Sequence, residues 1–177
     1  MRFFEKNFLK KMNKFLKIWV ITLSDRASKG IYEDKSGELL KKLLNNFFEN
    51  SMWDFEIKKF IISDDKIIFA KKLEDTKNQN INLLFTTGGT GISKKDITID
   101  VIKTFLDKEI NGIMEMIRFK YGQINPKAML SRSVAGIMKN TQVYCLPGSQ
   151  KAVEEYMNEI FKILEHSIFM QNDIDVH

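Results

Sequence analysis

Short apolar segments typical of β-strands alternate with amphipathic helical segments along most of this chain. This alternation limits the possible folds more than any other feature of the sequence. Residues 16–23 and 81–87 predict two buried strands, and the later segments 53–62, 134–137 and 142–146 predict three more. Helices are predicted between them, at about 36–48, 64–77, 98–107, 112–122 and 150–168. The pattern predicts an α/β fold, a three-layer α/β/α sandwich with a mostly parallel sheet.

Three serines stand where helices are expected to begin. Ser36 is the expected N-cap of the first long helix, and Ser63 that of a helix from about 64 to 77. Ser149 follows Pro147 and Gly148 and is expected to cap the last helix, which has the strongest apolar periodicity in the chain.

The charge of the chain is unevenly distributed. The 177 residues suit one domain and carry 28 basic and 23 acidic side chains, a net charge of +5. Residues 1–14 hold five of the basic residues and one acidic residue, so only +1 remains for residues 15–177. We therefore expect a basic leader over 1–14, loosely ordered or a short amphipathic helix, and a single domain over 15–177. Nucleic acid is not an expected partner.

The composition also excludes several classes of protein. No apolar run approaches the roughly 18 residues of a membrane span. One Cys excludes an internal disulfide and, with two His, a Cys/His zinc site. A cytoplasmic location is expected. Cys145 lies in an apolar strand and is expected to be buried, and His166 is interpreted as structural.

Polar segments follow the predicted strands. In an open α/β sheet, ligands bind at the carboxyl ends of strands. Segments 24–26, 63–65, 88–96 and 147–151 follow strands or turns, and 130–132 leads into one. We expect the functional site where these segments meet.

The glycine-rich turn 86–91, Thr-Thr-Gly-Gly-Thr-Gly, is the richest of these segments. Three glycines let backbone N–H groups converge on an anion, and threonine hydroxyls add donors. The alternative is a tight turn without a ligand. The turn is neither a Walker A motif nor a dinucleotide-binding fingerprint, because no Gly-Lys-Ser/Thr follows and Lys94 stands three residues after Gly91.

Two acidic residues are candidates for holding a cation beside this turn. Asp96 lies five residues after Gly91, and a carboxylate next to a phosphate is repulsive unless a cation lies between them. Mg²⁺ typically takes one or two carboxylates plus substrate phosphates. Asp64 or Asp65 is the candidate for the second carboxylate. The alternative role for this pair is favourable charge at a helix N-terminus.

Further anion-binding groups are expected around the same edge. Ser149 and Lys151 lie in the first turn of the last helix, although helix capping explains Ser149 equally well. Arg26 and Arg132 are suited to bidentate phosphate contacts, the alternative being two solvated loop residues.

Four ordered motifs resemble the MogA/MoaB family of molybdenum cofactor biosynthesis proteins, whose domain also occurs in gephyrin. The likeness covers about residues 16–170. The motifs are Ser24-Asp25-Arg26-Ala27-Ser28-x-Gly30-x-Tyr32-x-Asp34-x-Ser36-Gly37, Thr86-Thr87-Gly88-Gly89-Thr90-Gly91-x-x-x-x-Asp96-x-Thr98, Leu130-Ser131-Arg132-x-x-Ala135-Gly136-Ile137 and Pro147-Gly148-x-x-Lys151-Ala152. Departures are Lys95 in place of the usual Arg, Ile99-Asp100 in place of Pro-Glu, and Gln150 in place of Pro.

The resemblance implies a fold, an assembly and an activity. It implies a mixed sheet, a homotrimer and a molybdopterin adenylyltransferase that joins ATP and molybdopterin with Mg²⁺ and releases pyrophosphate. Asp64 and Asp96 match the catalytic and metal-binding positions. The implied binding residues are Ser24, Arg26, Thr87, Gly88, Gly89, Thr90, Gly91, Ser131, Arg132, Pro147, Gly148, Ser149 and Lys151. A molybdate-insertion protein is an implied partner.

Two other functions stay open from the sequence. One is a non-catalytic molybdopterin carrier or scaffold of the MoaB branch, which binds the pterin without turning over ATP. The other is a nucleotide-dependent oxidoreductase, which the missing glycine fingerprint disfavours.

Overall fold

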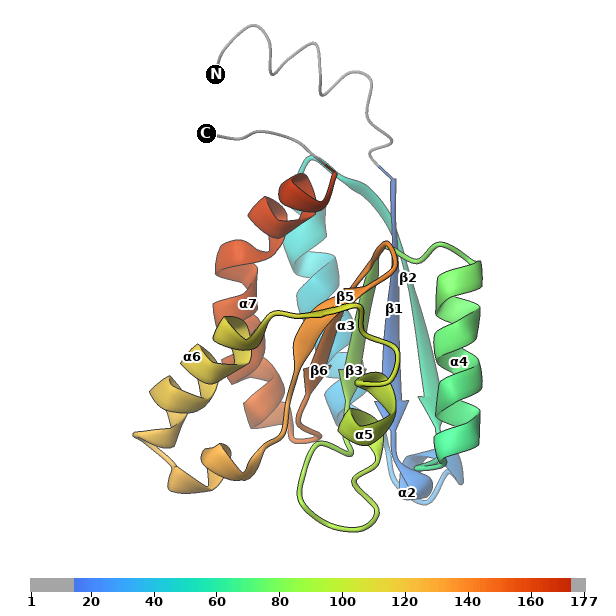
Figure 1. Ribbon diagram of the computed structural model, residues 1–177, viewed down its shortest axis with the longest axis vertical. Helices are drawn as coiled ribbons and strands as arrows, with labels where there is room; N and C mark the ends of the chain where they lie inside the picture. The colour runs from blue at the N-terminus through green and yellow to red at the C-terminus, as the bar shows by residue number, and fades with distance from the viewer. Residues whose placement is uncertain (1–14, 173–177) are drawn as a thin grey trace, which may run out of the picture.

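A mixed β-sheet forms the centre of the protein (Figure 1). The computed structural model describes residues 15–172, and within them the sheet has six strands in the order β2-β1-β3-β6-β5-β4. The strands are β1 Phe15–Leu23, β2 Asp54–Ile62, β3 Leu83–Thr87, β4 Lys108–Glu109, β5 Ala135–Met138 and β6 Thr141–Leu146.

Most of the sheet is parallel. β1 pairs in parallel with β2 and β3, and β3 pairs in parallel with β6. β5 is antiparallel to both β6 and β4, so the sheet is mixed at one side. The carboxyl ends of β1, β2, β3 and β6 therefore lie at one edge of the sheet, where the loops that follow them meet.

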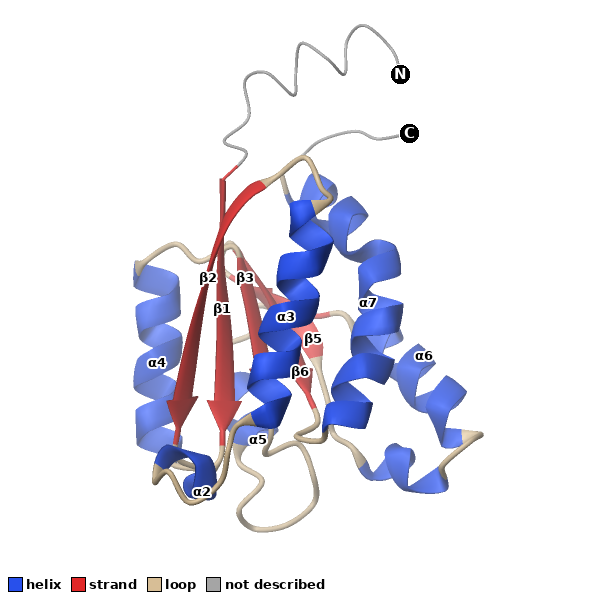
Figure 2. Ribbon diagram, turned by 180° about the vertical axis from the view of Figure 1, so that it is seen from behind, coloured by secondary structure: helices blue, strands red, loops and turns tan. Residues whose placement is uncertain are grey.

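Helices cover both faces of the sheet and confirm the three-layer α/β/α architecture. Figures 1 and 2 show α4 and α5 on one face and α3, α6 and α7 on the other. The helices are α2 Asp25–Ser28, α3 Lys35–Glu49, α4 Lys66–Asn78, α5 Thr98–Ile102, α6 Asn111–Gly122 and α7 Gln150–Gln171, with a 3₁₀-helix η1 at Pro126–Leu130.

The burial of β1 from Ile18 onward explains why this part of the strand is almost entirely apolar. Ile18 and Val20 pack into the core under α3 and α7, whereas Trp19 and Ile21 pack into the core under α4 and α5. Successive side chains of a strand point to opposite faces, and here both faces are covered by helices. From Ile18 to Leu23 the strand therefore has no solvent-facing side that requires alternating polar residues, whereas Lys17 near its start is exposed.

Several element boundaries differ from the sequence prediction. The cap of α3 is Asp34 rather than Ser36, and its side chain accepts from the backbone N–H of Gly37 at 2.8 Å. The cap of α4 is Asp65 rather than Ser63. The helix predicted over 98–107 ends at Ile102, because the following residues turn toward the short strand β4. The four-residue α2 and the two-residue β4 were not predicted.

Within residues 15–172, no helix is long and apolar enough to cross a membrane. The leader expected over residues 1–14 lies outside the described residues, as do 173–177 of the domain expected over 15–177.

Candidate functional site

The loops that follow the four parallel strands meet at one edge of the sheet (lower end of Figure 1). A cavity of about 220 Å³ opens there between the ends of β1, β3 and β6. Five predicted binding residues line this cavity: Ser24, Arg26, Thr87, Gly88 and Gly148. Six further lining residues are Thr22, Leu23, Ala27, Tyr32, Asp34 and Ser36.

The glycine turn is compact because its backbone lies very close to two neighbouring segments of the chain. Gly88 has φ +101° and Gly89 has φ +63°, conformations that L side chains rarely adopt. A Cβ on Gly88 would collide with the carbonyl oxygen of Leu23, and a Cβ on Gly89 would collide with the hydroxyl of Thr98. The glycines are therefore required by the turn itself, whatever it binds.

The threonine hydroxyls of this motif also stabilise the turn. Thr87 Oγ1 donates to the carbonyl of Pro147 at 2.8 Å and thereby ties the loop after β3 to the loop after β6. Thr98 Oγ1 donates to the carbonyl of Gly88 at 2.8 Å. Both hydroxyl protons are directed into the fold, so any ligand contact to Thr87 would use its oxygen as an acceptor.

Asp64 is linked to Asp25 by a reciprocal pair of hydrogen bonds. The N–H of Asp25 donates to Asp64 Oδ2 at 3.0 Å, and the N–H of Asp64 donates to Asp25 Oδ1 at 3.1 Å. The pair joins the loop after β1 to the loop after β2. Asp25 was not among the predicted site residues. Its position in the first motif was the available signal, but its partner lies 39 residues away.

The surroundings of Asp64 disfavour its negative charge. Burial raises the pKa of the Asp64 carboxyl above its usual value, and the charges of Asp25 and Asp96 raise it further. The Asp25 N–H and the Lys95 ammonium act in the opposite direction, and the net shift is upward. Asp96 and Lys95 thus lie close enough to Asp64 to influence its ionisation. The negative charges of Asp25, Asp64 and Asp96 thus influence one another, and nearby positive charge and hydrogen bonds offset them only in part.

Asp64 and Asp65, which the sequence could not separate, have different roles. Asp65 Oδ1 accepts from the backbone N–H groups of Ile67 and Ile68 at 2.8 and 3.0 Å and caps α4. The helix-terminus interpretation is therefore correct for Asp65, whereas Asp64 faces Asp25.

Asp64 and Asp96 fit a divalent cation that arrives with phosphate ligands. No group of three or more His, Cys, Asp or Glu side chains within residues 15–172 is placed to hold a metal ion by itself. Mg²⁺ commonly takes only one or two carboxylates and fills its other positions with water and substrate phosphates. Burial, together with the charges of Asp25 and Asp96, raises the pKa of Asp64, and a bound cation would offset this cost of ionisation.

Arg132 fixes the loop that carries Asp96. Its Nε donates to the carbonyl of Gly91 at 2.7 Å, and its NH2 donates to the carbonyl of Asp96 at 2.6 Å. Its NH1 donates to Asp100 Oδ1 at 2.6 Å. Much of the donor fork predicted to bind phosphate is thus used to position the loop. The carboxylate of Asp96 itself accepts from the N–H of Ser93 at 2.7 Å.

The buried Asp34 organises one wall of the cavity. It accepts from Thr22 Oγ1 at 2.8 Å, and Lys59 Nζ lies 3.0 Å from its carboxylate. Burial alone would raise the pKa of Asp34, but hydrogen bonds from Gly37, Lys59 and Thr22 outweigh burial and lower its pKa. Asp34 was quoted in a motif but was not predicted as a site residue.

The other predicted residues lie at different distances from this cavity. Arg26 is exposed at its mouth, with its guanidinium carbon 5.4 Å from the centre of the Tyr32 ring. Ser149 caps α7 by accepting from the N–H of Ala152, and Lys151 is exposed beside Glu155 at 3.8 Å. Neither of these two lines the cavity.

Ser131 joins the site from the opposite side of the glycine turn. Its hydroxyl lies 3.4 Å from that of Thr90, and the N–H of Arg132 donates to the carbonyl of Thr90 at 2.8 Å. These contacts hold the third motif against the second, in line with the expectation that the polar segments meet at one place.

Neither residue interpreted as structural belongs to this site. Cys145 is fully buried, and burial raises the pKa of its thiol to about 12. It is therefore protonated at neutral pH. His166 lies near the far end of α7, away from Ser149.

Comparison with known proteins identifies the family. The family described as "Probable molybdopterin binding domain" matches residues 19–166. A Pyrococcus furiosus protein named molybdopterin adenylyltransferase is 37% identical, over 89% of this chain and 95% of its own. A Helicobacter pylori protein of the same name is 33% identical, over 85% of each.

Solved structures agree with these sequence matches. The tungsten cofactor synthesizing protein MoaB from Pyrococcus furiosus superposes with a TM-score of 0.78 at 34% identity, covering 90% of this chain and 99% of that one. The molybdopterin biosynthesis Mog protein from Mycobacterium ulcerans superposes with a TM-score of 0.79 at 26% identity, over 88% and 99%. The chain belongs to the molybdopterin-binding MogA/MoaB family, which confirms the resemblance of its four motifs.

Proposed function

We propose that this protein is a molybdopterin adenylyltransferase of molybdenum cofactor biosynthesis. It transfers AMP from ATP to the terminal phosphate of molybdopterin, with Mg²⁺, and releases pyrophosphate. One observation supports the proposal most directly: the half-buried Asp64, backed by Asp25 and close to Asp96, lies at the same sheet edge as the Gly88–Gly89 turn. The names of the two relatives at 37% and 33% identity support the same activity.

The substrates meet at the edge between the first and second motifs. The cavity lined by Ser24, Arg26 and Gly88 receives one phosphate-bearing substrate. Arg26 is exposed and free of carboxylate partners among the described residues, so its guanidinium is available to a phosphate. The loop 91–96, fixed by Arg132, holds Asp96 near enough to Asp64 for its charge to raise the pKa of Asp64.

The reaction needs positioning and charge compensation more than proton transfer. A terminal phosphate is already an anion, so an oxygen of molybdopterin attacks the α-phosphorus of ATP without a strong base. The new P–O bond forms as the bond from the α-phosphorus to the bridging oxygen breaks, and pyrophosphate leaves with that electron pair. When bound by Asp64 and Asp96, Mg²⁺ supplies charge neutralisation for these phosphates. The protein contributes fixed geometry through the rigid turn.

Asp96→Asn tests this assignment. The variant is expected to lower the rate of pyrophosphate release from ATP and molybdopterin by roughly 100-fold or more, while molybdopterin binding is largely retained. Asp64→Asn is expected to behave alike. Asp54→Asn, at the opposite end of β2, removes an equal charge away from the site and serves as the control. Loss of binding together with turnover in a folded Asp96→Asn variant would instead indicate a pterin-binding or structural role.

The same assay separates the catalyst from a carrier. A relative from Staphylococcus aureus that is 32% identical is named molybdenum cofactor biosynthesis protein B, a name that specifies no reaction. A carrier with this pocket would bind molybdopterin and release no pyrophosphate from ATP. Binding without turnover in the wild-type protein would therefore contradict the proposal and favour the carrier.

We also propose that the protein assembles as a homotrimer. A continuous stretch from α6 to η1 exposes five large apolar side chains, each 57–71% accessible, and the two elements pack together. They are Met116, Phe119, Ile124, Met129 and Leu130. Apolar surface gathered in this way marks an interaction site more often than bare solvent-facing surface. Further copies of the chain would cover it.

The cellular setting follows from the proposed substrates. ATP and a reduced, unpaired Cys145 are compatible with the cytoplasm. The adenylylated product would pass to a molybdate-insertion protein.

A further inference from the structure

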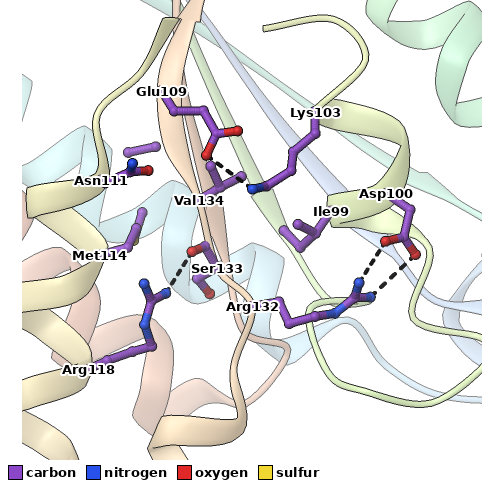
Figure 3. Close-up of a pocket in the computed structure, with 11 residues that line it drawn as sticks. Ile99, Asp100, Lys103, Glu109, Asn111, Met114, Arg118, Arg132, Ser133 and Val134 are labelled. Carbon is purple, nitrogen blue, oxygen red and sulfur yellow. Dashed lines mark hydrogen bonds and ion pairs between the residues drawn. The ribbon is translucent and has the colours of Figure 1, made fainter.

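A second cavity lies on the other side of Arg132, between α5, the β4–β5 edge and α6 (Figure 3). Its volume is about 360 Å³, within the usual size range of small-molecule sites. It shares no lining residue with the cavity of the proposed active site. It is lined by Ile99, Asp100, Lys103, Glu109, Asn111, Met114, Arg118, Arg132, Ser133, Val134 and Ala135.

One cation in this cavity is not neutralised. Lys103 pairs with Glu109 at 3.1 Å, and Arg132 pairs with Asp100 at 2.6 Å. Arg118 has no carboxylate partner among the described residues, and its NH1 donates to the carbonyl of Ser133 at 2.8 Å. Figure 3 shows its guanidinium directed toward the space between α6 and the sheet. A guanidinium carries five N–H groups, so donors and a net positive charge remain for a ligand.

The lining is mixed, with the ion-paired groups, Asn111 and Ser133 beside four apolar residues. Ile99, Met114, Val134 and Ala135 are each less than 5% exposed and lie beside the charged groups. Apolar lining with a few directed polar groups is typical of sites for small organic molecules. Because Arg118 favours a carboxylate or a phosphate, the lining suits an anion with a flat apolar body.

We propose that this cavity binds a small organic anion, a carboxylate or phosphate on a flat apolar body, and that Arg118 is its principal anchor. The apolar body lies against Met114 and Val134, and the anionic group accepts from the free N–H groups of Arg118. The inference does not depend on adenylyl transfer, because Arg118 and the apolar lining lie outside the cavity of the proposed active site. Arg132 is the residue that the two sites have in common.

Arg132 connects this cavity to the loop that holds Asp96. The same guanidinium that faces the cavity donates to the carbonyls of Gly91 and Asp96 and pairs with Asp100. An anion in the cavity competes with Asp100 for Arg132 and so changes the restraint on the loop 91–96. Occupancy of the cavity is thereby transmitted to a proposed metal ligand.

Calorimetric titration tests the binding site. Benzoate and phenyl phosphate serve as carboxylate and phosphate probes, with benzyl alcohol as the neutral control. We expect at least one anion to bind the wild-type protein and benzyl alcohol not to bind. Arg118→Gln should lower the affinity for that anion at least tenfold, and Arg118→Lys should lower it less. Lys120→Gln is the control, because Lys120 lies two residues after Arg118 and donates to Glu159 outside the cavity. This variant should leave the affinity for the anion unchanged. Absence of binding by both anions at millimolar concentration would overturn the proposal.

A second variant keeps the test valid if Arg118→Gln is unstable. Asn111 is exposed at the start of α6, so Asn111→Trp fills the cavity mouth without altering the core. It should abolish anion binding. Affinity unchanged in both Arg118→Gln and Asn111→Trp, or displacement of the probe by Mg-ATP, would place the anion elsewhere and contradict the assignment.

Hydrogen–deuterium exchange tests the connection through Arg132. The bound probe is expected to change exchange in the peptide covering 88–97 in the wild-type protein, and not in Asn111→Trp. Unchanged exchange in this peptide at saturating probe would overturn the connection.

Discussion

Asp64 is a carboxylate whose ionisation opposes folding. Because its pKa is raised in the folded protein, the native state keeps its proton at pH values where the unfolded chain has lost it. The free energy of unfolding therefore falls as the pH rises from about 4, the usual carboxyl pKa, through the raised pKa. The protein tolerates this cost at a position where the proposed reaction needs a carboxylate.

Replacing Asp64 should consequently stabilise the protein at neutral pH. Asp64→Asn keeps a carbonyl oxygen that can accept from the Asp25 N–H but removes the charge. We expect a higher melting temperature than wild type at pH 8 and no difference below about pH 4, where both side chains are neutral. Scanning calorimetry over a pH series measures this. A lower melting temperature at pH 8 would contradict the electrostatic account.

Gly89 should be far less replaceable than Gly112. Gly89 combines φ +63° with a Cβ direction blocked by the Thr98 hydroxyl, whereas a Cβ on Gly112 meets open space in the first turn of α6. Gly89→Ala is expected to cost about 1–3 kcal/mol of unfolding free energy. Gly112→Ala should gain about 0.5–1 kcal/mol. Urea denaturation of both variants checks the contrast, and equal effects would show that the turn is not strained.

At the scale of elements, the two long helices that flank β1 and β2 begin at aspartate caps in unlike settings. Asp34 is buried and bonded to Thr22 and Lys59 of the sheet, whereas Asp65 is exposed and caps α4 without an ion pair. Both aspartates cap a helix, but of the two only Asp34 also contacts side chains of the sheet.

Removal of each cap should reveal this difference. Asp34→Ala is expected to cost on the order of 3 kcal/mol, because Lys59 loses its buried partner, and Asp65→Ala about 1 kcal/mol. The lowered pKa of Asp34 means that its contribution is present above the usual carboxyl pKa and is lost as the pH falls through the lowered value. The Asp34→Ala deficit should therefore shrink in acid. Chemical denaturation at pH 7 and pH 3 tests both points.

The sequence predicted the elements better than their connections. The alternation of apolar strands with amphipathic helices was sufficient for the layers. The polar segments after strands meet at one edge of the sheet, as expected, and the assignment of the functional site to that edge stays a prediction. The caps of α3 and α4 were misassigned by two residues because Ser and Asp are both good caps. For α3, the preference for Asp34 over Ser36 involves Lys59, a contact 25 residues away that no local pattern contains.

Site residues with distant partners were the hardest to predict. Asp25 acquires its role only through Asp64, and Arg132 through the carbonyls of Gly91 and Asp96. These hydrogen bonds join residues of different loops, and the order of the strands in the sheet decides which loops are neighbours. The roles of Ser149 and Lys151 in ligand binding stay predictions, since the capping by Ser149 is compatible with either role.

At the scale of the whole molecule, the apolar stretch on α6 and η1 should control assembly. Phe119→Asp places a charge in the middle of this surface and is expected to convert the proposed homotrimer to monomers at micromolar concentration. Ile67→Asp is the control, because Ile67 on α4 is 81% exposed but lies on the opposite face of the sheet. Light scattering measures both masses. A wild-type protein of monomer mass would refute the trimer, and a trimeric Phe119→Asp would place the interface elsewhere.

The two ends of the described chain lie together, at the edge of the sheet opposite the proposed site. Leu16 and Asn172 line one common cavity at the amino ends of the strands, whereas Ser24, Gly88 and Gly148 lie at the carboxyl ends. A segment attached at either end of the described residues would thus leave from the side of the domain opposite the proposed active site. A domain joined at either of these ends would therefore lie away from the edge at which the proposed substrates enter.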